Sequence, residues 1–160
     1  RELRFYVDVS HRGSGNLLKY RGARAATPTE QELRYALGDI DSGLSNLAAR
    51  YLGATGTEQL MLTMGDRGAI RFYPNESGGD RLATDYLPSL SDTATDAIGA
   101  GDVFLAGMAL CDVSNVDPHL ALYFSSCLSS LQISRLGNRP SSTTDLQSFL
   151  LLRPELQDAK

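Results

Sequence analysis

Two glycines separated by one alanine, followed at once by an aspartate and an apolar run, constrain this chain more than any other stretch. Gly99 and Gly101 can adopt backbone angles closed to other residues and add no side chain, so a ligand can approach the main chain closely. The apolar run of residues 103–110 predicts a helix. The first turn of such a helix has unpaired N–H groups and the positive end of the helix dipole, which together favour a bound phosphate.

Asp102 lies beside this predicted anion hole. A bound phosphate repels a carboxylate, so phosphate binding alone does not favour an aspartate here. An aspartate at this position is explained if its carboxylate takes a proton from a hydroxyl that then attacks phosphorus. These residues therefore indicate a kinase that acts on an alcohol. The alternative interpretation is an ordinary helix N-terminus with an acidic residue and two glycines that serve packing.

The segment of residues 96–102, Asp-Ala-Ile-Gly-Ala-Gly-Asp, resembles the Asp-Thr-Thr-Gly-Ala-Gly-Asp signature of the ribokinase-like (PfkB) carbohydrate kinases. Ala97 and Ile98 stand in place of the two threonines, while Phe104 and Gly107 also match the family pattern. The substitutions keep the main-chain role of the loop and remove the two threonine hydroxyls.

This resemblance implies roles for the loop and for a turn farther along the chain. Asp102 would be the catalytic base, and the backbone of Gly99, Ala100 and Gly101 would hold the transferring phosphate. Asp96 would help to bind a monovalent cation such as potassium. The remaining cation ligands implied by the resemblance are Ile98, Gly137 and Ser141.

A second motif begins at Thr27-Pro28, which is a helix-start signal followed by acidic residues in the first turn. A well-capped helix explains this pattern by itself. The segment is also similar to the Thr-Pro-Asn-x-x-Glu element of the same kinases, with Thr29 where the family has Asn. That similarity implies that Thr29 and Glu32 support the magnesium and phosphate end of the site. The flanking residues look more like the heptose-phosphate kinase branch than like ribokinase itself.

Two further patterns have both a structural and a functional interpretation. Residues 59–64 and 69–73 read as strands around a Gly-x-x-Gly turn, which any hairpin could contain. The turn also resembles the Thr-Leu-Gly-x-x-Gly nucleotide element of these kinases, which implies that Thr63, Gly65 and Gly68 lie near the nucleotide. Ser126 either lets two helices approach closely or, as the resemblance implies, lines the adenine pocket.

Apolar periodicity places strands and helices in alternation along the chain. Strands are expected at residues 5–9, 59–64, 69–73 and 81–87, and helices at 29–37, 41–52, from 102 onward, from 117 onward and at 144–152. The pattern predicts an α/β domain with a mostly parallel central sheet. The resemblance implies the three-layer ribokinase-like fold.

Composition limits the function classes. The chain has 160 residues, 42% of them hydrophobic and 21% charged, with a net charge of −4, which disfavours nucleic acid or an anionic membrane as the main partner. Apolar runs are too short to cross a bilayer, so we expect a cytoplasmic protein. Cys111 and Cys127 fall on apolar helix faces and are expected to be buried, reduced thiols, without the spacing of a zinc site.

The motifs that resemble the family all belong to its carboxyl-terminal half. We therefore expect residues 1–160 to be the carboxyl-terminal nucleotide-binding and catalytic portion of the kinase domain, with the amino half absent and a homodimer formed through that half. The expected activity is phosphoryl transfer from ATP, with Mg²⁺ and K⁺ as further cofactors, to a hydroxyl of a sugar or sugar phosphate. The alternative is a nucleotide-binding or regulatory module that has lost catalysis.

Overall fold

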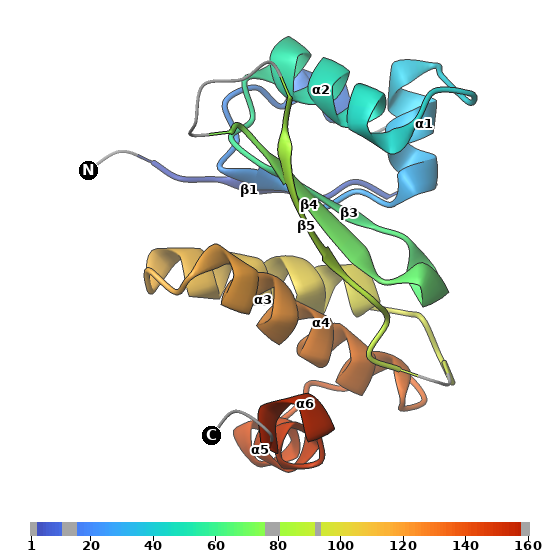
Figure 1. Ribbon diagram of the computed structural model, residues 1–160. Helices are drawn as coiled ribbons and strands as arrows, with labels where there is room; N and C mark the ends of the chain where they lie inside the picture. The colour runs from blue at the N-terminus through green and yellow to red at the C-terminus, as the bar shows by residue number, and fades with distance from the viewer. Residues whose placement is uncertain (1–2, 11–15, 76–80, 92–93, 158–160) are drawn as a thin grey trace. The chain divides into compact units, whose positions relative to one another are not determined.

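The computed structural model describes residues 3–10, 16–75, 81–91 and 94–157. The chain divides into two compact units, Arg1–Pro88 and Ser89–Lys160. Unit 1 contains the sheet and two of the longer helices, and unit 2 contains the remaining helices, as the labels of Figure 1 show. The expected α/β class is confirmed.

Unit 1 is built on a five-stranded mixed sheet in the order β1-β2-β3-β4-β5. Neighbouring strands from β1 to β3 pair in parallel, whereas β3, β4 and β5 pair antiparallel. The expected parallel arrangement is therefore confined to β1–β3, because the short connections after β3 and β4 suit hairpins, while parallel neighbours need a longer crossover. The elements are β1 (Tyr6–Val7), η1 (Leu17–Lys19), β2 (Ala25–Ala26), α1 (Glu30–Leu37), α2 (Leu44–Thr55), β3 (Leu60–Thr63), η2 (Gly65–Arg67), β4 (Ala69–Tyr73) and β5 (Ala83–Leu87).

Helices α1 and α2 cover one face of this sheet (Figure 1). Leu33 of α1 and Tyr51 of α2 are fully buried in one cluster with Leu60 and Phe72, which pair across β3 and β4. Burial of such side chains contributes roughly 1.5–3 kcal/mol each. This core fixes the ends of β2 and β3, from which the loops of unit 1 begin.

Helix α2 begins at Leu44 and not at the expected Asp41. The guanidinium of Arg34 donates to the carbonyl oxygens of Ile40 (2.8 Å) and Ser42 (2.9 Å), and these bonds hold the preceding segment as a loop. Gly43 then caps the helix with an extended backbone. The apolar pattern did not reveal this boundary because the loop is fixed by a side chain from another helix.

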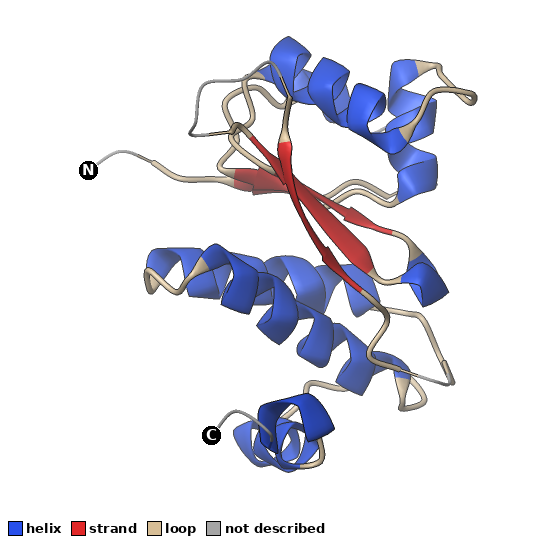
Figure 2. Cartoon of the chain, in the orientation of Figure 1, coloured by secondary structure: helices blue, strands red, loops and turns tan. Residues whose placement is uncertain are grey.

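Unit 2 consists of helices, drawn in blue in Figure 2. They are α3 (Ala100–Val113), α4 (Pro118–Ile133), α5 (Thr143–Leu151) and α6 (Pro154–Gln157). Helices α3 and α4 pack closely, since a Cβ atom on Gly107 would lie 3.2 Å from the Cα atom of Ser125. Cys111 and Cys127 are buried and free, as expected, and burial raises the pKa of Cys127 to about 11.

Within the described ranges, no helix is both long enough and apolar enough to pass through a membrane.

Candidate active site

The loop before α3 is shaped by Gly99, the N-cap residue of that helix. Its φ of 80° is left-handed, a region that favours glycine. A Cβ atom at this position would also lie 2.5 Å from Oδ1 of Asn138. Val103 donates its N–H to the carbonyl oxygen of Gly99 (3.1 Å) and so begins the helix. The backbone angle therefore favours glycine at position 99, and a larger residue there would also displace the side chain of Asn138.

The first turn of α3 presents two open donors. Among the described residues, neither the N–H of Gly101 nor that of Asp102 has a hydrogen-bond acceptor. The Asp102 side chain is exposed at the third position of the helix. Two free N–H groups, the helix dipole and an accessible carboxylate thus lie within one turn, an arrangement that can bind an anion and accept a proton beside it.

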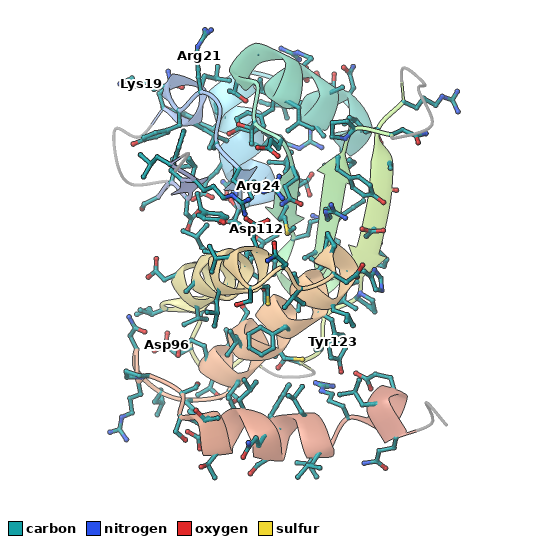
Figure 3. The ribbon with its side chains drawn as sticks, turned by 90° about the vertical axis from the view of Figure 1, so that its left-hand side faces the viewer. Lys19, Arg21, Arg24, Asp96, Asp112 and Tyr123 are labelled. Carbon is teal, nitrogen blue, oxygen red and sulfur yellow. The ribbon has the colours of Figure 1, made fainter. Side chains whose placement is uncertain are left out.

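Asp96 joins this loop to the turn after α4, and Figure 3 labels it. Its Oδ1 accepts the N–H of Ile98 (3.0 Å) and its Oδ2 accepts the N–H of Gly137 (3.0 Å). The N–H groups of Thr95 and Asp96 both donate to the carbonyl oxygen of Ile133, at 2.8 and 3.2 Å. The structure therefore brings Asp96, Ile98 and Gly137 together, although they are separated in the sequence.

Two of the remaining predicted residues of unit 2 make fewer contacts. Ser141 follows the turn, half-buried, with no hydrogen bond to any described residue. Ser126 is half-buried on α4, one turn before Ser129, whose hydroxyl donates to the carbonyl oxygen of Ala100 (3.3 Å). The α4 serine face thus contacts the start of α3 through Ser129 rather than through Ser126.

Sequence reasoning missed Gln132 and Asn138. The amide nitrogen of Gln132 donates to the carbonyl oxygen of Ile98 (3.2 Å) and to Oδ1 of Asn138 (3.1 Å). The available signal was a polar amide between Leu131 and Ile133 in an otherwise apolar stretch.

Unit 1 gathers the other predicted residues at one end of β3. Thr29 forms an isolated parallel bridge with Thr63, and the N–H of Thr63 donates to the carbonyl oxygen of Pro28 (3.0 Å). Thr29 and Glu32 form a capping box, in which Thr29 Oγ1 accepts the Glu32 N–H (3.2 Å) and Glu32 Oε2 accepts the Thr29 N–H (2.8 Å). The interpretation as a well-capped helix is therefore confirmed, and Glu32 keeps its second carboxylate oxygen for other partners.

The Gly-x-x-Gly turn follows β3 directly. Gly65 and Gly68 both have positive φ, 63° and 88°. The Met64 N–H donates to the carbonyl oxygen of Gly68 (2.8 Å), which closes the turn before β4. The hairpin interpretation of this stretch is confirmed, and the turn places the Gly65 backbone next to Thr63.

An acidic and basic cluster that the sequence did not reveal lies beside this turn. Glu30, in the first turn of α1, forms ion pairs with Arg67 of η2 and with Arg34 (2.9 Å). The hydrogen bond from Arg67, followed by that from Arg34, holds the pKa of the Glu30 carboxyl below its usual value. These pairs tie the Gly-x-x-Gly turn to the helix that carries Glu32.

This cluster predicts a specific pH dependence of stability. Because the folded pKa of Glu30 is lowered from 4.5, its contribution is present above that pH and is lost as pH falls through the folded value. The unfolding free energy of the wild type should fall between neutral pH and pH of about 3. In Glu30→Gln this fall should be smaller by roughly 0.5–1 kcal/mol. Urea unfolding at both pH values measures it. An acid-induced loss as large in Glu30→Gln as in the wild type would contradict the prediction.

Comparison with known proteins shows which family the chain resembles. The family described as pfkB family carbohydrate kinase matches residues 12–145. A curated relative, the bifunctional protein HldE of Gluconacetobacter diazotrophicus, is 24% identical over 153 residues, which cover 94% of this chain and 29% of the relative. The chain thus spans under a third of that relative's length.

Solved structures share the fold. Ribokinase from Thermotoga maritima matches with a TM-score of 0.69 and 22% identity, over 81% of this chain and 42% of that one. A putative ribokinase II from E. coli, in complex with ATP and Mg²⁺, has a TM-score of 0.67 at 21% identity, over 82% and 40%. Phosphofructokinase-2 from E. coli in complex with potassium has a TM-score of 0.68 at 16% identity, over 84% and 42%.

These likenesses confirm the ribokinase-like fold, and the family match covers most of the chain. The chain belongs to the pfkB family of carbohydrate kinases.

Proposed function

We propose that this chain is the nucleotide-binding and catalytic portion of a kinase that transfers a phosphoryl group from ATP to a hydroxyl of a sugar or sugar phosphate. The observation that carries the proposal is the first turn of α3, where the N–H groups of Gly101 and Asp102 lack an acceptor among the described residues beside an exposed carboxylate. Membership of the family supports a sugar acceptor. The match to HldE and the heptose-phosphate kinase resemblance favour a phosphorylated heptose.

In this proposal, Asp102 accepts the proton of the acceptor hydroxyl as the oxygen attacks the γ-phosphorus of ATP. The N–H groups of Gly101 and Asp102 stabilise the charge on the transferring phosphoryl group. Gly99 sets the direction of both donors because its left-handed backbone starts the helix. The acceptor can reach Asp102 since this side chain is exposed.

Unit 1 would support the nucleotide phosphates. One carboxylate oxygen of Glu32 is used in the capping box with Thr29, and the other is left for the water shell that magnesium usually keeps. Magnesium, when bound, would neutralise charge on the phosphates. Thr63, Gly65 and Gly68 lie at the same end of β3 as Thr29, which supports their assignment to the nucleotide. Ser126 is proposed to line the adenine pocket.

Three of the four proposed potassium ligands already accept hydrogen bonds through the oxygens that would bind it, which leaves each of these oxygens a second lone pair for a cation. Both carboxylate oxygens of Asp96 already accept N–H groups, and the carbonyl oxygen of Ile98 accepts the Gln132 amide. The carbonyl oxygen of Gly137 accepts the N–H of Arg139 (2.9 Å). We assign no catalytic step to a monovalent cation.

Titration calorimetry with ATP and magnesium, followed by an assay of ADP release over a panel of sugars and sugar phosphates, tests the proposal. We expect saturable nucleotide binding and turnover with one acceptor class. Binding without turnover would favour the inactive module, to which Ala97 and Ile98 in place of the family threonines also point. A folded chain that binds no nucleotide would contradict both functions.

A further inference from the structure

Gln132 links the loop before α3 to the turn after α4 through a single amide. It lies in the last turn of α4 and is 1% exposed. Its nitrogen donates to the carbonyl oxygen of Ile98 and to the side chain of Asn138, which in turn lies against Gly99. The Gln132 side chain therefore contacts the loop at Ile98 and also contacts Asn138, which lies against Gly99.

The orientation of this amide follows from its neighbours. The carbonyl oxygen of Ile98 can only accept, so the nitrogen and not the oxygen of Gln132 points toward it, and Oδ1 of Asn138 accepts from the same nitrogen. The Gln132 oxygen is buried without a partner among the described residues. A buried acceptor without a partner is unfavourable, and packing alone would be served better by an apolar side chain such as its neighbours Leu131 and Ile133.

The other ties of the loop do not replace this one. Thr95 and Asp96 bond to the end of α4 through their N–H groups, and Asp96 also bonds to Gly137. Beyond Asp96, the Gln132 amide holds the carbonyl oxygen of Ile98, directly before Gly99. A cation would attract the carbonyl oxygen of Ile98, and the Gln132 amide binds this same oxygen while it also donates to Asn138.

We infer that Gln132 positions the loop before α3, residues 96–99, which we call the anion-hole loop. Its neutral amide holds this loop in place of a monovalent cation. The inference rests on the proposed function of the loop and adds that this kinase needs no potassium to order it. Gln132 acts through Ile98 and Asn138 and does not touch the reacting groups.

Amide hydrogen exchange of the nucleotide-free chain, followed by NMR, tests this inference. The informative amides are those of Ile98 and Gly137, which both donate to Asp96. Gln132→Met keeps the size of the side chain but removes both donors, so exchange at these amides should become about threefold to tenfold faster, the value of about one hydrogen bond. Potassium chloride, compared with choline chloride at equal ionic strength, should slow exchange again in Gln132→Met and leave the wild type unchanged.

A second variant and a control make the result specific. Gln132→Glu turns a carboxylate toward two acceptors, so potassium should slow its exchange most. Ser125→Ala removes another buried polar group of α4, whose hydroxyl donates within the helix to the carbonyl oxygen of Ala121 (2.7 Å), and should change neither amide. Unchanged exchange in Gln132→Met would overturn the inference.

The wild type provides a test that does not depend on the folding of any variant. Slower exchange of Ile98 and Gly137 in potassium than in choline would show that a cation orders the loop and would overturn the inference. Since no nucleotide or sugar is present, this result is separate from the activity test, so a failure of this inference can be told apart from a failure of the proposed function.

Discussion

Asp102→Asn is expected to lower kcat of the active protein by about two to four orders of magnitude, the usual contribution of a general base. The substitution keeps the size of the side chain and removes its capacity to accept a proton. The affinity for ATP should change little, because the N–H groups of Gly101 and Asp102 belong to the main chain and remain in place. Steady-state kinetics with the best acceptor, together with calorimetry for ATP, measures both quantities.

A matched control separates this effect from the loss of one negative charge. Asp41 is an exposed aspartate of the loop before α2 and is not one of the candidate site residues. Asp41→Asn makes the same chemical change and should leave kcat unaltered. If Asp102→Asn retained the wild-type kcat, Asp102 would not be the base, and the anion hole alone would remain of the proposed mechanism.

Gly99→Ala should have the second largest effect, on both folding and activity. The backbone at this position has φ of 80°, which costs an alanine roughly 1–2 kcal/mol. The added methyl group would also approach Oδ1 of Asn138 to 2.5 Å, so the side chain of Asn138 or the loop must move. We expect unfolding free energy to fall by about 2 kcal/mol and turnover to fall with it, because the two open donors follow directly.

A double substitution divides this loss into its two causes. In Gly99→Ala combined with Asn138→Gly, the clash is relieved but the backbone strain stays. The fall in stability caused by the alanine should then be smaller in the Asn138→Gly background than in the wild type, as measured by urea unfolding in a double-mutant cycle. Equal losses in both backgrounds would mean that Asn138 does not confine Gly99.

The features that could be predicted from the sequence are local ones. The glycines and apolar run around Asp102 specify a loop and a helix within a dozen residues, and the structure contains both. The capping box of Thr29 and Glu32 likewise needs only neighbouring residues. These motifs also carried the family resemblance, which the family match later confirmed.

Features that depend on contacts between distant segments were missed. The strand Ala25–Ala26 has only two small residues and is defined by its pairing with β1 and β3, so its sequence has no strand pattern. The start of α2 depends on Arg34, and the loop before α3 depends on Gln132. The deciding bonds join residues from 8 to 34 positions apart, which an apolar repeat along one element does not report.

The close contact of α3 and α4 limits which substitutions the helix pair can accept. The two helices meet where Gly107 lies against Ser125 and Leu128, and the Cα atom of Ser125 would be 3.2 Å from a Cβ atom at position 107. The first turn of α3 and the last turn of α4 hold the anion-hole loop between them. Substitutions on the outer surfaces of the helix pair would keep this spacing, whereas a single methyl group at Gly107 would meet Ser125 and Leu128 and press the two helices apart.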